Sequence, residues 1–232
     1  MSYVFQPEAL TALPVYGSEL QFAVRRVYCV GRNYAAHARE MGSDPERESP
    51  FFFCKPGNAV MPAAAGQILT LPYPSQTTNL HHEIELVVAI GKAGADIPAA
   101  QAHEHVWGYA IGLDMTRRDL QGQMKAAGKP WEIGKAFDHS APIATLYPQT
   151  QTGWLTSAAM SLQVNGAVRQ QSNIDQMSWP VADIIHHLSR YFTLQPGDVI
   201  MTGTPEGVGA VVPGDELQAS IAGLGEMRVR IS

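Results

Sequence analysis

The chain is poor in cysteine: its 232 residues include only Cys29 and Cys54. Two cysteines cannot form the disulfide framework of a small secreted protein, so a reducing compartment, the cytoplasm, is expected. The chain also lacks a run of basic residues, and its formal net charge is −5. Because nucleic-acid-binding surfaces need clustered Lys and Arg, no nucleic-acid partner is expected.

Long apolar runs are missing as well, since no segment approaches the roughly 20 residues that a membrane-spanning helix requires. The first ten residues, MSYVFQPEAL, contain no basic stretch followed by a long apolar one, so no signal peptide is expected. Hydrophobic residues make up 45% of the chain and charged residues 16%, values typical of a globular protein with a substantial core. No membrane partner is expected.

Short apolar runs separated by Gly, Pro and Asn predict many strands and few helices. Residues 1–26 are interpreted as an irregular leader, and residues 27–232 as a single catalytic domain. The clearest hairpin runs over residues 160–171, because Asn165-Gly166 tolerates the positive φ angles of a type I′ turn. Helices are expected over residues 34–41, 114–127 and 181–192. The predicted fold class is a β-rich α+β domain.

Acidic residues supply the strongest chemical signal. Glu83 and Glu85 lie two residues apart in an otherwise apolar strand, so both side chains leave the same face. Close, buried carboxylates repel each other and are hard to ionise. Asp114 ends another apolar run, and a third acid nearby would complete a site for a hard divalent cation that prefers oxygen ligands, Mg²⁺, Mn²⁺ or Ca²⁺. The alternative is an acidic pair that faces solvent on a half-exposed strand.

Histidines give two further patterns. His37 and Glu40 lie three residues apart on a predicted helix, so the carboxylate could fix the imidazole tautomer and leave the other nitrogen to accept a proton. An ordinary exposed pair is the alternative. His103 and His105 have the residue type that zinc prefers, but no third ligand is well placed, so a surface or core pair is favoured.

Six motifs occur in a characteristic order: VGRNYAAHAREM, FFFCKP, HHEIEL, GLDMTRRDLQ, GKAFD and GTPEGVG. In this order they resemble the short, single-domain members of the fumarylacetoacetate hydrolase family, over roughly Val27 to the C-terminus. The resemblance implies a mixed β-sandwich roll, a homodimer and a Mg²⁺ or Mn²⁺ site that cleaves a carbon–carbon bond beside a ketone. It implies an acylpyruvate substrate, with fumarylpyruvate the first choice, and assigns the catalytic dyad to His37 and Glu40.

Four more residues are assigned roles, Lys135 and Thr204 by the resemblance and Arg118 and Gln121 by their spacing. Lys135 would lie beside the substrate oxygen that gains negative charge; its alternative is a surface lysine with a buried stem. Arg118 and Gln121 follow Asp114 by four and seven residues, so one helix face is predicted to carry all three, with Arg118 and Gln121 binding substrate. Their alternatives are a surface ion pair and a solvated amide. Thr204, in a Gly-rich loop, would anchor a substrate carboxylate; its alternative is a tight turn.

These roles predict a hydrolysis in which His37 activates water and pyruvate leaves as its enolate. Two other functions remain open. The same site would support decarboxylation or keto–enol tautomerisation of oxaloacetate, neither of which needs a nucleophilic water. A protein that binds a small oxo acid without turning it over is the more distant alternative.

Overall fold

Strands make up most of the regular structure in the computed structural model, which describes residues 2–40 and 49–232. The larger sheet is mixed, because β3–β15 and β5–β11 pair in parallel and the remaining pairs are antiparallel. In spatial order it contains β4 (Phe51–Lys55), β3 (Val27–Gly31), β15 (Val199–Met201), β8 (Ile84–Ile90), β9 (Val106–Leu113), β11 (Ala141–Ala144) and β5 (Val60–Ala63), with β12 (Tyr147–Pro148) beside β9.

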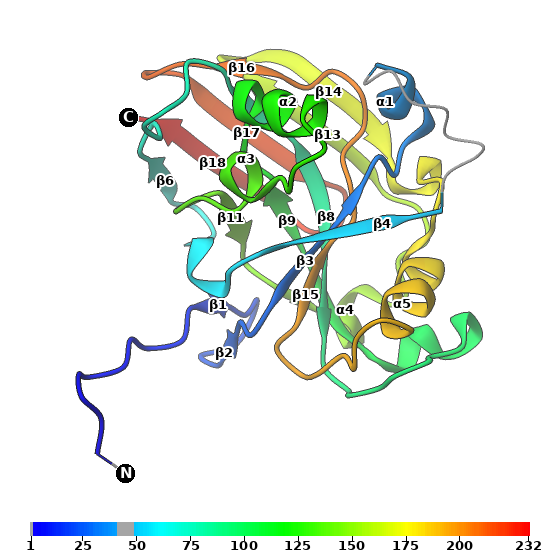
Figure 1. Ribbon diagram of the computed structural model, residues 1–232. Helices are drawn as coiled ribbons and strands as arrows, with labels where there is room; N and C mark the ends of the chain where they lie inside the picture. Colours follow the sequence, from blue (N-terminus) through cyan, green and yellow to red (C-terminus); the bar gives the residue numbers. More distant parts are fainter. Residues whose placement is uncertain (1, 41–48) are drawn as a thin grey trace.

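A second sheet packs against the first. Its order is β14 (Ala167–Asn173), β13 (Ala159–Val164), β17 (Glu216–Ile221), β18 (Glu226–Ile231) and β6 (Ile68–Leu71). Buried and exposed residues alternate along β17 and β18, as expected for strands with one face on a core. Leu162 and Leu217 of this sheet share a buried cluster with Leu86 and Ile111 of the larger one, so the two sheets enclose the main core (Figure 1).

Strand β8 is buried at every residue, which shows that both of its faces are covered. Leu86 and Val88 point into the main core, while Val87 and Ala89 belong to a second apolar cluster on the opposite face. Glu85 alternates with Leu86 and therefore shares the face of Val87. The candidate acids thus lie on the side of the sheet that faces away from the main core.

A small third sheet borders this region, in the order β10 (Thr116–Arg117), β7 (Leu80–His82) and β16 (Gly209–Val211). Its pairing changes one sequence prediction. A helix was expected to begin at Asp114, but Thr116 and Arg117 pair with β7, and the amide of Arg118 donates to the Asn79 carbonyl at 2.9 Å. The helix therefore begins only at Arg118, and Asp114 is not on it.

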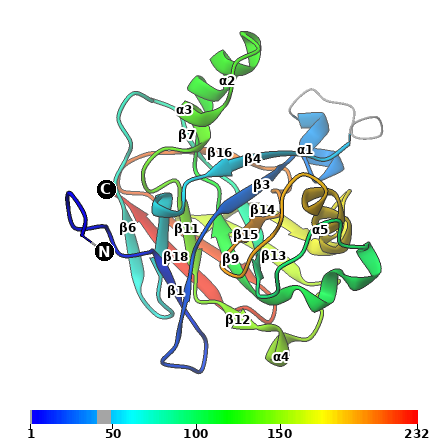
Figure 2. The ribbon, with the colours of Figure 1, turned by 60° about the horizontal axis from the view of Figure 1, so that its bottom comes forward.

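The helices are short, as expected for a β-rich chain. They are α1 (Ala35–Glu40), α2 (Arg118–Ala126), α3 (Glu132–Lys135), α4 (Gln149–Thr152) and α5 (Val181–Ser189), with 3₁₀ turns at Gly57–Ala59, Ala99–Glu104 and Ile174–Gln176. The predicted helices over 34–41 and 181–192 correspond to α1 and α5; residue 41 lies outside the described residues. Figure 2 shows α2 projecting from the body of the protein. Within the described ranges, no helix combines the length and apolar character needed to cross a membrane.

The hairpin predicted over residues 160–171 is confirmed. Strands β13 and β14 pair antiparallel and meet at Asn165 and Gly166, whose φ angles are +51° and +78°. Both values lie in the left-handed region that a type I′ turn requires. The β-rich α+β class predicted from the sequence is confirmed by the two packed mixed sheets.

The N-terminal residues contain more structure than the irregular leader that was predicted. β1 (Ala12–Pro14) and β2 (Gln21–Ala23) form a small antiparallel pair. Leu13 is fully buried in the second apolar cluster, which fixes this pair on the sheet. Residues 2–10 are exposed and run away from the body (Figure 1). The division of the chain at residue 26 stays a prediction.

Candidate metal centre and active site

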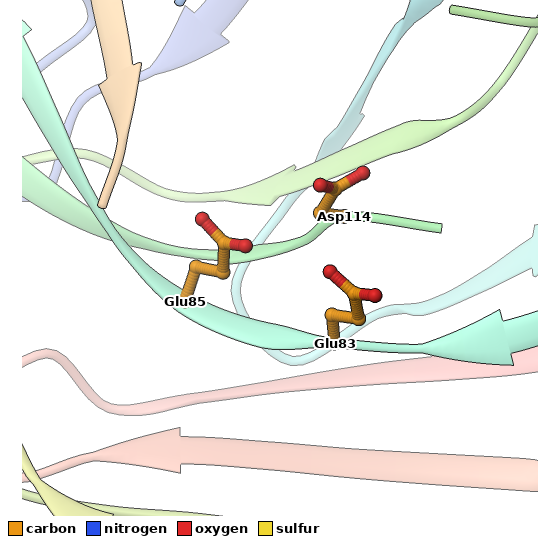
Figure 3. Close-up of side chains that lie close together, drawn as sticks. All are labelled: Glu83, Glu85 and Asp114. Atoms are coloured by element: carbon orange, nitrogen blue, oxygen red, sulfur yellow. The ribbon is translucent and has the colours of Figure 1, made fainter. Parts of the chain in front are cut away.

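Three carboxylates converge because of how β8 and β9 pair. Glu83 lies between β7 and β8, and Asp114 directly follows β9. The amide of Asp114 donates to the carbonyl of Glu83 at 2.9 Å, so these two residues are cross-strand neighbours. Glu85 pairs with Gly112, where a side chain would overlap that of Val87. Figure 3 shows Glu83 and Glu85, from the same stretch of chain, on the side that faces Asp114.

The resulting cluster is compact and almost dry. Glu83, Glu85 and Asp114 each offer an oxygen within 4.8 Å of the others. Their exposed fractions are only 4%, 2% and 1%. The solvent-facing acidic pair that the sequence left open is therefore wrong, and the spacing of Glu83 and Glu85 does place both on one face.

Glu85 is the least compensated of the three acids. Its Oε2 accepts a 2.7 Å hydrogen bond from the Gly203 amide, and among the described residues it has no salt bridge. Burial raises its pKa well above the usual range, and the charges of Asp114 and Glu83 raise that pKa further. A cation at this corner would favour the ionised carboxylate and so oppose both effects.

Glu83 is held ionised by two cationic neighbours. Lys135 Nζ lies 2.9 Å from one of its oxygens, and Arg118 forms a short contact with the other. Burial alone would raise the pKa of Glu83, but the charges of Lys135 and then Arg118 outweigh burial and lower it. Lys135 also donates to Asp114 Oδ2 at 2.6 Å and Thr116 Oγ1 at 2.7 Å. Burial would lower the pKa of Lys135, yet Asp114 and Glu83 raise it.

A second buried lysine, Lys55, contacts the acidic cluster through Asp114. Lys55, at the end of β4, has a fully buried side chain, and its Nζ lies 2.8 Å from Asp114 Oδ1. It also donates to the carbonyl of Lys135 and, at 3.3 Å, to that of Met115. Lys55 therefore ties β4 to the segments that carry Asp114 and Lys135.

The residues present fit a hard divalent cation. All the close donors are carboxylate oxygens, which suits Mg²⁺, Mn²⁺ or Ca²⁺ better than zinc. Asp114 Oδ1, although near Lys55, receives no well-directed hydrogen bond from the described residues, so it retains a lone pair for a ligand. His103 and His105 are not part of any such cluster in the described chain, and the ring of His105 interacts with the Lys92 carbonyl at 3.0 Å.

The predicted dyad is assembled on α1. His37 Nδ1 lies 3.1 Å from Glu40 Oε2, and His37 is 5% exposed. With Nδ1 donating to the carboxylate, Nε2 is left as a proton acceptor. His37 lines the same pocket as the three acids, so the exposed surface pair that was the alternative is wrong for the imidazole.

The start of α2 brings Arg118 and Gln121 to the acids even though Asp114 is not on that helix. Arg118 Nη1 donates to Gln121 Oε1 at 2.5 Å. Gln121 is 6% exposed, so the fully solvated amide that was its alternative is wrong. Both residues line the pocket, which encloses about 560 Å³ of space, part of it open to solvent.

Thr204 also lines this pocket, and its orientation is set by a residue that sequence reasoning missed. Gln170 is buried on β14, and its Oε1 accepts from the Ile84 amide at 3.1 Å. Because a backbone N–H can only donate, the other end of the side chain is the amide nitrogen, which donates to Thr204 Oγ1 at 2.8 Å. The Thr204 hydroxyl hydrogen is therefore free to point elsewhere.

Gln170 was missed because the residues next to it in the sequence do not indicate that it is buried. Of the seven residues of β14, it is the single one fully buried, in a strand whose sequence, AVRQQSN, suggests an exposed edge. His82 Nδ1 lies 2.9 Å from the same Gln170 oxygen, and the Gln170 amide nitrogen also donates to the Pro205 carbonyl at 2.9 Å. Only the folded pairing reveals that one polar residue links β8 to the Gly-rich loop.

Comparison with known proteins establishes the class. A model of the fumarylacetoacetate (FAA) hydrolase C-terminal domain matches residues 26–232. The chain belongs to the fumarylacetoacetate hydrolase family, as its motifs predicted.

Three relatives sharpen this result. A crystal structure of fumarylpyruvate hydrolase from Pseudomonas aeruginosa, in complex with Mn²⁺ and pyruvate, is 64% identical, has a TM-score of 0.98 and matches 99% of each chain. A fumarylpyruvate hydrolase of a Ralstonia species is 44% identical over 188 residues, 81% of this chain and 95% of the relative. An oxaloacetate tautomerase of Escherichia coli K12 is 41% identical over 208 residues, 89% of this chain and 93% of the relative.

The acidic cluster leads to a first prediction. Mn²⁺ at a hundredfold excess over its dissociation constant should stabilise the protein by about 2.7 kcal/mol, or raise Tm by about 5–10 °C. The Glu85→Gln variant should lose this shift because it removes a charged ligand. Without metal it should be at least as stable as the wild type, because the repulsion within the cluster is relieved. Differential scanning fluorimetry with and without Mn²⁺ measures both effects.

Glu104→Gln provides the matched control, since Glu104 is an exposed acid paired with Lys92 outside the pocket. This control should keep the full metal shift. Equal metal shifts in wild type and Glu85→Gln would contradict a metal role for Glu85.

Proposed function

We propose that this protein is a Mg²⁺- or Mn²⁺-dependent hydrolase that cleaves a carbon–carbon bond in acylpyruvates, with fumarylpyruvate as its main substrate. The observation that carries the proposal is that the three buried carboxylates and the His37–Glu40 pair line one pocket. The fumarylpyruvate hydrolases among the relatives support the substrate, and the Mn²⁺ and pyruvate bound to one of them support the cofactor and product. We assign the catalytic residues to a domain over residues 27–232.

When bound by Glu83, Glu85 and Asp114, the ion supplies a Lewis acid beside the 2-oxo acid end of the substrate. Around it, Arg118, Gln121 and Thr204 hold the substrate carboxylate by hydrogen bonds. Thr204 can donate to that carboxylate because Gln170 already donates to its oxygen. These contacts orient the substrate before any bond changes.

His37 then acts as the general base. Its Nδ1–H is held by Glu40, so Nε2 removes a proton from a water that adds to the carbonyl distal to the 2-oxo acid. The bond between that carbon and the adjacent methylene breaks, and its electron pair passes to the pyruvate fragment. Lys135 stabilises the negative charge that develops there, and return of the proton gives pyruvate plus a carboxylic acid, fumarate in the case of fumarylpyruvate.

Tautomerisation of oxaloacetate is the second candidate, and the oxaloacetate tautomerase relative favours it. Decarboxylation of oxaloacetate belongs to the same group of reactions. These reactions need enolate stabilisation by the ion and Lys135, but they do not need water to be activated. His37 therefore separates hydrolysis from decarboxylation, whereas tautomerisation still needs a base to move the proton.

The second prediction uses this difference. In His37→Ala, kcat for fumarylpyruvate hydrolysis should fall by about a hundredfold or more, because a positioned general base contributes at least that much. Hydrolysis is measured as the decrease of the diketone ultraviolet band. EDTA should stop this decrease, and added Mg²⁺ should restore it. Oxaloacetate decarboxylation measured alongside should fall much less.

His103→Ala is the control, because His103 is exposed and does not line the pocket. It should hydrolyse fumarylpyruvate as the wild type does. Hydrolysis that persists in His37→Ala, or after complete chelation, would refute the proposed mechanism. If the wild type hydrolyses no acylpyruvate but converts oxaloacetate, the oxaloacetate reaction replaces acylpyruvate hydrolysis as the proposed function.

The third prediction concerns Thr204 and Gln170. Thr204→Val should raise KM for fumarylpyruvate by about tenfold or more, because it removes a hydrogen bond to a charged group. Gln170→Met should raise KM as well, since it frees the hydroxyl to turn away. In the double variant the effects should not multiply, because Gln170 acts through Thr204. Steady-state kinetics of the four proteins give the comparison.

A purely structural Gln170 would give a different pattern: its substitution would lower stability and change KM by the same factor with or without the threonine. Thr204→Ser, which keeps the hydroxyl, should retain most of the wild-type KM. A KM change that multiplies in the double variant would contradict the positioning role.

We further infer that two copies associate and that the protein acts in the cytoplasm. Apolar side chains near the N-terminus support the association, because Tyr3, Val4, Phe5 and Leu10 are 66–101% exposed in the single chain. Light scattering coupled to size-exclusion chromatography should give about twice the 25.1 kDa chain mass. Deleting residues 2–10 should weaken the dimer; a monomeric wild type would contradict this inference.

A further inference from the structure

Helix α2 carries Arg118, and the short segment of chain before β7 fixes the base of that helix. Asp119, the second residue of α2, accepts a 2.6 Å hydrogen bond from Thr77 Oγ1 and one of 3.2 Å from the Thr78 amide. The Arg118 amide donates to the Asn79 carbonyl at 2.9 Å. Although α2 projects from the body (Figure 2), its first turn is therefore tied to the chain that runs into β7.

The guanidinium of Arg118 is held at each of its three nitrogens. Nη1 donates to Gln121 Oε1 at 2.5 Å, and Nη2 forms a short contact with Glu83. Nε donates to His81 Nδ1 at 3.4 Å. Each terminal nitrogen carries a second N–H group, and these two groups have no acceptor among the described residues. They are therefore the groups that a substrate carboxylate would meet, and the three contacts set their direction.

The contact with Arg118 fixes the tautomer of His81. A guanidinium N–H can only donate, so His81 Nδ1 accepts and carries no hydrogen. The imidazole hydrogen is therefore on Nε2, which donates to Asn79 Oδ1 at 2.9 Å. His81 is thus a neutral imidazole held at both nitrogens, between the segment before β7 and the substrate-binding arginine.

The two adjacent histidines of β7 face opposite sides of the strand. His81 pairs with Thr116, whose Oγ1 accepts from Lys135 Nζ, so the side chain of His81 lies on the face that borders the acidic cluster. His82 lies on the other face, where its Nδ1 is 2.9 Å from Gln170 Oε1. That oxygen also accepts from a backbone amide, so Nδ1 of His82 carries a hydrogen, unlike Nδ1 of His81.

We propose that His81 is a positioning residue for substrate binding, because it holds the guanidinium of Arg118 in the orientation that binds the carboxylate of the 2-oxo acid. The inference rests on the proposed function and deepens it. Without the acceptor at Nδ1, Arg118 Nε loses its partner and the guanidinium is free to turn. The carboxylate site is then less well preorganised, which weakens substrate binding but leaves the reacting carbonyl untouched.

Two variants of similar side-chain shape separate the hydrogen bond from packing. His81→Asn keeps an oxygen close to the position of Nδ1, whereas His81→Leu has no acceptor. His81→Leu should raise KM for fumarylpyruvate about tenfold and change kcat by less than about twofold, because Arg118 binds the carboxylate equally in the ground state and the transition state. His81→Asn should retain most of the wild-type KM. Steady-state kinetics measure both constants.

His186→Leu is the matched control, because His186 is also half-buried and interacts with a carbonyl, that of Ile97 at 2.8 Å, outside the pocket. It should change neither KM nor kcat. In an Arg118→Gln background, His81→Leu should raise KM no further, since His81 acts through Arg118. Equal KM values for His81→Leu and His81→Asn, or a further rise in the double variant, would overturn the inference.

A second variant keeps the test available if His81→Leu does not fold. Asn79→Ala removes the acceptor for His81 Nε2 and leaves the imidazole free to rotate. It should raise KM for fumarylpyruvate by a smaller factor than His81→Leu, again with little change in kcat. An unchanged KM in Asn79→Ala would count against the positioning role.

Binding of pyruvate separates this inference from the proposed function. Titration calorimetry on the Mn²⁺-loaded protein should show that His81→Leu binds pyruvate about tenfold more weakly than the wild type, while His81→Asn keeps most of the affinity. Equal affinities in the wild type and His81→Leu would overturn the inference even if fumarylpyruvate is hydrolysed. If no acylpyruvate is hydrolysed, the proposed function fails, while pyruvate binding still decides whether His81 orients Arg118.

The Mn²⁺-induced shift in Tm shows whether the acidic cluster is intact in these variants. His81→Leu should keep the wild-type shift, because Glu83 retains its 2.9 Å contact with Lys135. Loss of the shift would also contradict the inference, since the effect of His81 would then lie at the acids and not at Arg118.

Discussion

Repulsion among three buried carboxylates is the constraint on which the rest of the site depends. Glu83, Glu85 and Asp114 offer oxygens within 4.8 Å of one another with almost no water to screen them. The buried side chains of Lys135 and Lys55 partly neutralise this negative charge. Without the acids, burying either ammonium group would be strongly unfavourable. The cations do not reach Glu85 in the described structure, and a bound metal ion would offset the cost of ionising that carboxyl group.

Packing on both faces of the sheet fixes the pairing register of β8 and β9. A shift of one residue between β8 and β9 would turn Glu85 into the main core and Leu86 out of it. Leu86 and Val88 on one face, with Val87 and Ala89 on the other, therefore fix the register that brings Glu83 beside Asp114. The same packing that stabilises the fold sets the geometry of the acids.

Local spacing was enough to predict part of this site. A spacing of two residues from Glu83 to Glu85, and of three residues from His37 to Glu40, defines a shared face on a strand or a helix before any tertiary contact is known. The hairpin at Asn165-Gly166 was also predictable from local sequence, because these two residues tolerate the positive φ angles of a type I′ turn. Motif order supplied the family and the roles proposed for Lys135 and Thr204.

Features that depend on distant pairing were not predictable. The helix expected from Asp114 begins at Arg118 because the intervening residues pair with β7. Gln170 is polar in a polar strand, and nothing nearby shows that it is buried between β8 and the Gly-rich loop. The hairpin of β1 and β2 forms where Leu13 finds a core contributed by strands far along the chain.

The hydrogen bond from Gly203 to Glu85 affects how substitutions at this glutamate are to be interpreted. Gly203 directly precedes Thr204, so one carboxylate both belongs to the acidic cluster and restrains the Gly-rich loop. Glu85→Ala would disturb the acidic cluster and the loop at once, so a higher KM in that variant would not report on the ion alone. A glutamine retains an oxygen acceptor for the amide, and so separates the two roles of a single side chain.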